Sequence, residues 1–249
     1  MGDVQGRDGV DRLRSALWQA DASERLQAAL TAGTRPDDRF IDVLVERCEV
    51  EPDFYVRDML TWALTRHDRA YTVAALLAQL ESDIGQARSQ ALHTLSKMAD
   101  PDTWSSVTPA LLRDSDPEVA RAAWRTAAGL VPVGGEEQLA SQLASQFGRG
   151  DRDTQRSLSR AFATIGPNAK PVVELAVASG DDTISTHALA TLTIMDAPEE
   201  PFDAAVEEAK RVVALRAAPT TGLTMLSGAV AQRSAPVHGC CATMTGSGC

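Results

Sequence analysis

The stretch DSDPEVARAAWRTAAGL, residues 114–130, decides the fold class of this 249-residue chain. It opens with Asp residues and a proline, which are typical of a helix's first turn. An Asp side chain there accepts free backbone amides, and a proline at the first helical position loses no hydrogen bond. Apolar residues then recur at helical spacing from Val119 to Leu130. The stretch predicts an amphipathic helix that begins with an Asp cap.

The same pattern occurs six times along the chain, at intervals of 31 to 35 residues. Each copy opens with an Asp, carries Arg or His four or five residues later, and continues with apolar residues at helical spacing. The positions are Asp21 and Arg25, Asp53 and Arg57, Asp83 and Arg88, Asp116 and Arg121, Asp151 and Arg156, and Asp182 and His187. We expect these residues to form a structural ladder of turn caps and ion pairs between repeats.

A second set of amphipathic segments alternates with these copies, at residues 39–48, 71–81, 102–113, 136–147 and 168–178. Each unit therefore reads as helix, short turn, helix. Gly33 is one of several residues that we expect to interrupt the chain between units. Trp62, Trp104 and Trp124 lie at helical spacing among apolar residues, which predicts that they belong to the core.

These features resemble the HEAT-repeat family, most clearly over residues 38–196. The resemblance implies an all-α, right-handed α-solenoid of about six helix hairpins over residues 8–216. We expect residues 1–7 to be a flexible N-terminus and residues 217–249 a disordered tail rich in Ser, Thr, Gly and Cys. The stacked second helices of such a solenoid form a concave surface that binds an extended peptide or another protein.

Several function classes are disfavoured by the sequence. A net charge of −10 argues against a general nucleic-acid binder, although it leaves room for a local basic patch. We find no phosphate-binding loop, dinucleotide turn, nucleophile elbow or zincin helix. Among HEAT-like enzymes, alkylpurine DNA glycosylases would need a basic DNA-binding face. Bilin lyases stay open, without a supporting motif.

The chain also lacks a secretory signal and an apolar run of about 18 residues, so we expect a cytoplasmic protein without a membrane partner. The leading hypothesis is a non-enzymatic protein–protein interaction scaffold that needs no cofactor and uses its concave surface.

The tail poses a separate question, because three of the four cysteines lie in the last ten residues: Cys240, Cys241 and Cys249. One hypothesis is that these cysteines do nothing specific. A second is a soft-metal site for Cu(I) or Zn(II), with His238 or the Met244 thioether as a further ligand. Adjacent cysteines do not form the usual Cys-x-x-Cys chelate.

A third hypothesis rests on a resemblance of the tail to lanthipeptide-type peptide cores, in which dehydrated Ser and Thr react with cysteine thiolates. The candidate acceptors are Ser234, Thr243, Thr245 and Ser247, and the donors are Cys240, Cys241 and Cys249. The sequence LSGA, residues 226–229, resembles a double-glycine leader cleavage site at Gly228 and Ala229. The HEAT body would then be a carrier or leader that docks a peptide-modifying enzyme.

Overall fold

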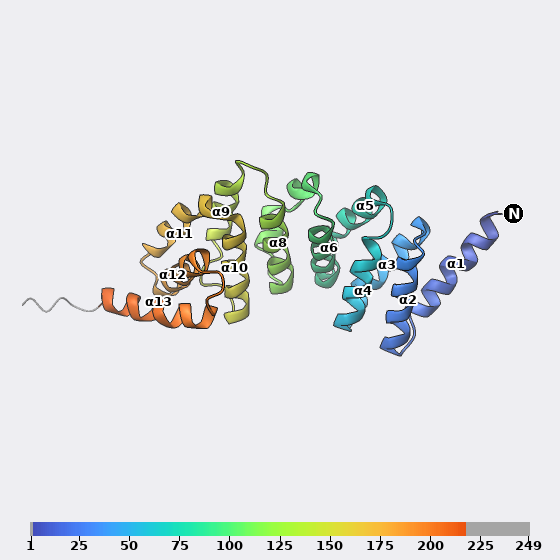
Figure 1. Cartoon of the computed structure of the whole chain (residues 1–249), viewed down its shortest axis with the longest axis horizontal. Coiled ribbons are helices and arrows are strands. Elements are labelled where there is room, and N and C mark those ends of the chain that lie inside the picture. Colours follow the sequence, from blue (N-terminus) through green and yellow to red (C-terminus); the bar gives the residue numbers. More distant parts are fainter. Residues whose placement is uncertain (1, 218–249) are drawn as a thin grey trace, which may run out of the picture. The chain divides into compact units, whose positions relative to one another are not determined.

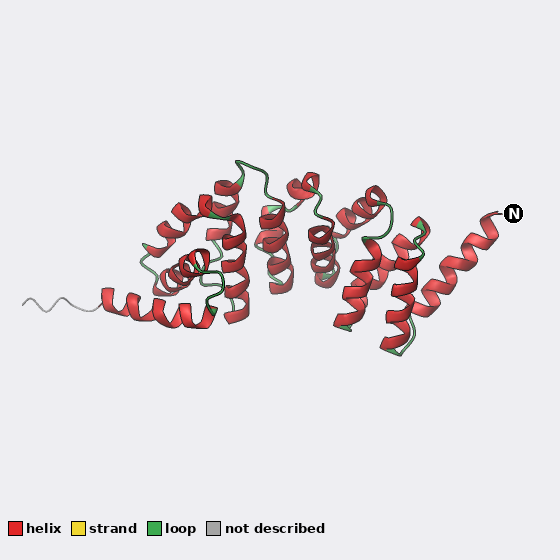
Figure 2. Ribbon diagram, in the orientation of Figure 1, coloured by secondary structure: helices red, strands yellow, loops and turns green. Residues whose placement is uncertain are grey.

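The computed structural model describes residues 2–217, and every regular element in that range is a helix (Figure 2). The α-helices are α1 Gly2–Leu17, α2 Ala22–Thr34, α3 Ile41–Val50, α4 Phe54–Leu64, α5 Arg69–Gln79, α6 Gly85–Met98, α7 Pro109–Leu112, α8 Pro117–Leu130, α9 Glu136–Ala144, α10 Arg152–Ile165, α11 Lys170–Val177, α12 Asp182–Asp196 and α13 Phe202–Ala217. Three short 3₁₀ turns complete the set: η1 Asp38–Phe40, η2 Pro101–Ser106 and η3 Pro167–Ala169.

Consecutive α-helices up to α12 pair into six helical hairpins within the described residues. The second helices of these hairpins, α2, α4, α6, α8, α10 and α12, pack one against the next along the array (Figure 1). We call the exposed side of this row the second-helix face. The predicted fold class, an all-α solenoid of about six hairpins, is confirmed.

The helix α13 covers the apolar end of the array. Its buried residues Phe202, Ala205 and Val206 pack with Ala190 and Ile194 of α12. A repeat array needs such a cap because its last unit has a neighbour on one side only. At the other end α1 begins at Gly2, within the segment that we expected to precede the solenoid.

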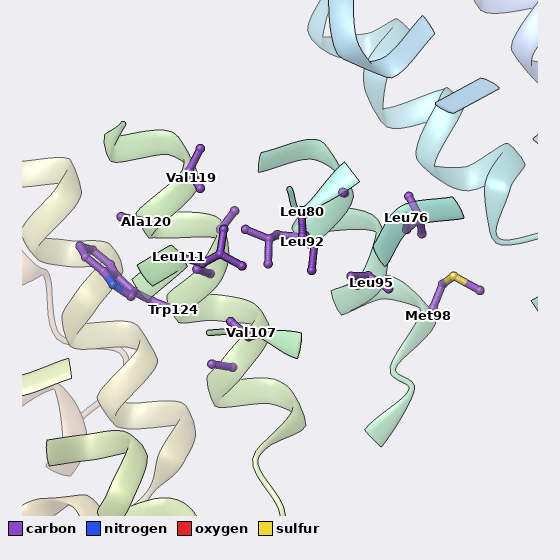
Figure 3. Packing of buried hydrophobic residues seen from close by; sticks show 14 of the residues in the cluster. Leu76, Leu80, Leu92, Leu95, Met98, Val107, Leu111, Val119, Ala120 and Trp124 are labelled. Atoms are coloured by element: carbon purple, nitrogen blue, oxygen red, sulfur yellow. The ribbon is translucent and has the colours of Figure 1, made fainter. Parts of the chain in front are cut away.

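The core runs continuously between the hairpins, and Figure 3 shows its middle part, where Leu92 and Leu95 of α6 and Val119 of α8 belong to one cluster of buried side chains. Trp124 is fully buried, and its indole Nε1 donates to the Leu112 carbonyl at 2.8 Å. Trp62 differs from the expectation, since 38% of it is exposed. The ring of Trp62 lies against α2 instead of filling the core.

The segment 102–113, expected to be a single helix, is two short pieces, η2 and α7. Thr108 separates them with an extended backbone and caps α7, and Pro109 follows as the first helical residue. Proline disfavours the helical conformation at the residue before it and has no amide to donate. These two effects interrupt the helix.

Gly33 was expected to break the chain between units, but it lies inside α2 and is buried. A Cβ atom at this position would be 2.4 Å from Cζ3 of Trp62 and 2.8 Å from the Cα of Ala63. The glycine therefore permits the close approach of α2 and α4.

Candidate functional site

The caps of the second helices are mostly the expected Asp residues. At α4, Oδ1 of Asp53 accepts the amides of Tyr55 at 2.9 Å and Val56 at 3.0 Å. Three further helices begin in the same way, with caps at Asp21, Asp116 and Asp151.

Two caps differ from the prediction. The cap of α12 is Asp181, whose Oδ1 accepts the amides of Thr183 and Ile184, whereas Asp182 is already the first helical residue. At α6 the capping position is Ile84, so Asp83 lies one residue before it and caps nothing. The hydroxyl of Ser82 accepts the Ile84 amide at 3.2 Å instead.

At least one of the two carbonyl groups that precede each cap accepts a hydrogen bond from a side chain, in most units from one on the following helix. In the first three units this is an Arg four residues after the cap, which reaches back with Nη1. The bonds run from Arg25 to the carbonyls of Gln19 (3.0 Å) and Ala20 (2.8 Å), from Arg57 to those of Glu51 (2.9 Å) and Pro52 (2.8 Å), and from Arg88 to that of Ser82 (2.7 Å). A buried carbonyl without a partner is costly, which explains the recurrence.

Later units fill the same role with other residues. Gln155 donates to the Gly150 carbonyl at 3.4 Å, and Ser185 donates to the Ser179 carbonyl at 2.9 Å. At α8 the residue four after the cap is an alanine, and Arg149 reaches back from the following unit instead. It donates to the carbonyls of Asp114 and Ser115.

Arg121, Arg156 and His187 were expected to match the earlier arginines, but each lies at least one residue further along its helix. Arg121 forms an ion pair with Glu118 at 2.9 Å and donates to Oγ of Ser157 on α10 at 3.0 Å. The Arg156 guanidinium pairs with two carboxylates: those of Asp153 (2.6 Å) and Asp203 (3.3 Å).

Ion pairs between repeats occur, but not with the capping Asp residues that we expected. In two of them the acid lies two residues before a cap: Arg25 pairs with Glu51 at 2.8 Å, and Arg88 with Asp114 at 2.9 Å. Glu51 is fully buried and also pairs with Arg47 at 2.7 Å. Burial alone would raise the pKa of Glu51, but the hydrogen bonds from Arg25, the Asp53 amide and Arg47 hold it below its ordinary value.

His187 is buried in a network of neutral groups. Its Nδ1 accepts the Gly148 amide at 3.0 Å, so Nε2 carries the proton and donates to the Gln155 carbonyl at 3.0 Å. Ser159 and Thr191 extend the network through a hydroxyl–hydroxyl bond of 2.7 Å. Burial lowers the pKa of His187 to about 4, with a smaller contribution from Arg152, and the imidazole is therefore neutral.

The turn Gly148–Arg149–Gly150 connects units in both directions. Both glycines have positive φ, 79° and 71°, a conformation that glycine adopts without strain. The Gly148 amide bonds forward to His187, while the Arg149 side chain bonds back to the turn before α8.

A polar groove of about 520 Å³ lies on the second-helix face and crosses α4, α6 and α8. Phe54 and Asp58 line it from α4, Ser89 and His93 from α6, and Arg125 from α8. At the α4 end Phe54 is 65% exposed. Its ring meets the exposed ring of Tyr55 edge-on, with centroids 5.6 Å apart.

His93 occupies the centre of this groove. Its Nδ1 is 3.3 Å from Nη1 of Arg125, which joins α6 to α8 across the groove floor. Burial and the positive charges of Arg125 and Lys97 lower the pKa of His93, and Asp58 opposes them weakly. The neutral imidazole accepts the hydrogen bond from the Arg125 guanidinium. It carries no negative charge that could offset the charges of Arg125 and Lys97.

A second hollow, of about 920 Å³, lies at the end of the array between α1, α2 and η1. Leu13, Ala28, Ala32 and Phe40 give it an apolar lining. The first hairpin has a neighbour on one side only, which leaves part of its apolar surface uncovered.

Two features of the described residues bear on metal binding and on thiol chemistry. Within residues 2–217 no group of three or more His, Cys, Asp or Glu side chains could hold a metal ion. Cys48 is buried, and burial, aided by Glu49, raises the pKa of its thiol to about 12. The thiol is therefore protonated and unreactive. None of the helices in the described range is long and apolar enough to span a membrane.

The residues proposed for metal binding, modification or cleavage all lie in 226–249, outside the described part of the chain. These hypotheses stay predictions.

Comparison with known proteins agrees with the fold. Residues 41–128 match the family model for HEAT repeats. No curated protein matches the chain.

Solved structures that are similar to the chain include the following three. An engineered protein has a TM-score of 0.43 and 17% identity, over 83% of this chain and 97% of that one. The complex of CpcE and CpcF of phycocyanin lyase from Nostoc sp. PCC7120 has a TM-score of 0.41 and 15% identity, over 81% and 93%. Human deoxyhypusine hydroxylase in complex with glycerol has a TM-score of 0.42 and 14% identity, over 86% and 97%.

The family match agrees with the helical hairpins, their Asp-capped second helices and the arginines that close the turns. The match therefore supports a helical-repeat architecture for this segment. The predicted resemblance is thus confirmed over this segment: residues 41–128 match HEAT repeats, and the described residues form an α-solenoid of helical hairpins.

Proposed function

We propose that this protein is a non-enzymatic scaffold that binds another protein, or an extended peptide, in the groove over α4, α6 and α8. The observation that carries the proposal is the groove itself. It crosses three consecutive second helices inside the segment that matches HEAT repeats, and it combines an exposed aromatic end with a basic end.

The polar floor of the groove is held in place before any partner arrives. Gln86 donates to the carbonyls of Cys48 and Glu51, both at 2.9 Å. Gln90 donates to Oγ1 of Thr61 at 2.7 Å. Side chains that are already fixed lose little entropy on binding, which favours recognition of a partner.

The aromatic end supplies the part of the surface best suited to an anchor. The rings of Phe54 and Tyr55 are exposed next to each other, and aromatic residues dominate the energetics of many protein interfaces. The guanidinium of Arg57 lies 6.0 Å from the Phe54 ring centroid and steadies its position.

Site-specific photo-crosslinking in the native host tests this proposal. A crosslinking amino acid at Ser89, in the groove, should give a defined adduct with a partner protein. The same amino acid at Ala78, exposed on the first helix α5, is the matched control. The adduct should disappear when Phe54 and Tyr55 are both replaced by Ala. Equal adducts from Ser89 and Ala78, or adducts from Ala78 alone, would contradict the proposal.

We further propose that residues 8–216 are the complete binding unit. A chain that ends at Arg216 should give the same Ser89 adduct as the full chain. Loss of the adduct on this truncation would favour the tail as the functional part. Intact-mass measurement of the native protein, with thiol alkylation, would then show whether Ser and Thr have lost water.

A further inference from the structure

On α6, α8 and α10, three cations have no carboxylate partner among the described residues: Lys97, Arg125 and Arg160. All three side chains are exposed. Cations closer to the start of α8 and α10 are different, because Arg121 pairs with Glu118 at 2.9 Å and Arg156 with Asp153 at 2.6 Å. Over these three helices the face is therefore neutralised near the helix starts and basic further along the helices.

The repeat register places these cations side by side. Arg125 and Arg160 each lie nine residues after the cap of their helix, and His93 lies nine residues after the cap of α6. The contact of Arg125 with His93, at 3.3 Å, ties α6 to α8 at this level. One turn earlier the bond from Arg121 to Ser157 ties α8 to α10. Lys97, one turn after His93, begins the row.

Local structure explains only part of this arrangement. Lys97 lies in the last turn of α6, where the helix dipole favours a cation, whereas Arg125 and Arg160 lie before the last turns of α8 and α10. The helix dipole would favour a cation equally well if that cation also had an acidic partner, as other cations of this chain do. In a protein with a net charge of −10, an uncompensated basic row beside a groove is a feature for binding an anionic group.

We propose that Lys97, Arg125 and Arg160 bind an extended acidic segment of a partner protein, whose carboxylates occur at about every third residue. This inference rests on the proposed function. Packed helices are about 8–10 Å apart, and an extended chain advances about 3.3 Å per residue. One carboxylate per helix therefore requires a spacing of three residues.

The surroundings favour discrete carboxylates over the continuous charge of a nucleic acid. Asp58, Glu118, Asp153 and Asp203 are exposed on neighbouring parts of α4, α8, α10 and α13. A phosphate backbone that followed the row would approach these acids. A peptide with neutral residues between its carboxylates avoids them.

Fluorescence anisotropy with the full chain and a labelled peptide tests the inference at low ionic strength. The peptide carries Glu at every third position, with Ser and Gly between. It should bind, and its affinity should fall as salt is added. Peptides with Lys in place of Glu, or with the same Glu residues gathered in one block, should bind more weakly.

The variants Arg125→Glu and Arg160→Glu should each weaken binding of the spaced acidic peptide by about tenfold. Arg216→Glu makes the same change of net charge on the exposed end of α13 and should leave the affinity nearly unchanged. An equal loss in all three variants would overturn the inference, because it would mean that only total charge matters. Tighter binding of a single-stranded oligonucleotide, lost in the first two variants, would overturn the peptide assignment.

His93 supplies a readout specific to this site. A carboxylate bound beside it would counter Arg125 and Lys97 and add to the effect of Asp58, which favours the charged imidazole. Binding should therefore tighten between pH 7.5 and 5.5, and His93→Gln should remove that dependence. If the acidic peptide does not bind while the Ser89 adduct persists, the inference fails and the proposed function stands. If the adduct is also absent, both fail.

Discussion

Before α4, buried charges hold the turn: Glu51 lies between Arg25 and Arg47, and its backbone carbonyl is bonded by Arg57. Before α12, neutral groups perform the same task, because Ser185 bonds the turn carbonyls and His187 joins α12 to α10. Both arrangements satisfy the turn and tie one unit to the next. The repeat requires these bonds to be made and does not prescribe which residues make them.

The two arrangements differ in how they fail. A buried ion pair is stable only while each charge keeps its partner, because desolvation is expensive. A buried neutral imidazole is stable only while it stays unprotonated. Each turn can therefore be weakened by a change that leaves the other intact.

The largest expected effect is on the charged arrangement. Glu51→Gln keeps the size of the side chain but leaves Arg25 and Arg47 buried without a counter-charge. We expect it to reduce the free energy of unfolding of the N-terminal units by roughly 3–5 kcal/mol. Hydrogen exchange of α2 and α4 would measure it. The matched control Glu46→Gln removes a half-exposed partner of Arg14 and should cost at most about 1 kcal/mol. Equal effects of the two variants would refute the comparison.

As the pH falls, the turn before α12, which neutral groups hold, should lose stability before the turn that precedes α4. The pKa of His187 is about 4 in the fold, against an ordinary value of 6.5. Because the unfolded chain takes up the proton first, stability is complete above pH 6.5. It falls by about 3 kcal/mol as the pH drops to 4. Glu51 has a lowered pKa, so its contribution is lost only below its ordinary 4.5.

Hydrogen exchange across this pH range should therefore show α10 and α12 loosening before α2 and α4. His187→Gln, although less stable at neutral pH, should remove the step between pH 6.5 and 4. Simultaneous loosening of both ends would show that the array responds as one unit, contrary to this expectation.

The close packing of α2 against α4 gives a further test of the N-terminal units. Gly33→Ala would place a methyl group 2.8 Å from the Cα of Ala63, a backbone atom that cannot move cheaply. We expect a loss of about 1–3 kcal/mol in thermal or denaturant unfolding. Gly129→Ala is the control: nothing lies within 4 Å of its added Cβ. It should gain about 0.5–1 kcal/mol, since alanine favours the helix.

The smallest expected effect distinguishes two adjacent residues at the C-terminal turn. Asp181→Ala should cost about 1 kcal/mol because it removes the cap of α12. Asp182→Ala should cost less than about 0.5 kcal/mol, since it removes only an acidic side chain from the first turn. Denaturant unfolding of the two variants would separate them, and the reverse order would show that the cap is assigned wrongly.

The sequence predicted the fold class well because Asp caps and apolar spacing are local signals. Asp53 and Asp116 start their helices as expected. The pair Asp181–Asp182 misled the prediction because two adjacent Asp residues carry the same local signal. The turn geometry, set by the units on both sides, decides between them.

The groove and the bonds between units were harder to predict. The sequence comparison matched basic residues with one another at similar intervals along the chain. In the fold, equivalent positions are those that lie the same number of residues after the helix cap. Arg121 was thus matched to Arg57, although at α8 the residue equivalent to Arg57 is Ala120. Arg149, which bonds the turn carbonyls in place of an arginine on α8, comes from another unit, and no pattern within one repeat predicts it.

Arg149 also limits how the chain can be divided. The segment that matches HEAT repeats ends at residue 128, before the turn that supplies this side chain. Even a fragment cut at Leu130, with α8 complete, would leave the carbonyls of Asp114 and Ser115 to water. The smallest autonomous piece that contains the groove should therefore extend to at least residue 150. The segment that matches the repeats in sequence is therefore shorter than the segment that supplies all the hydrogen bonds of their turns.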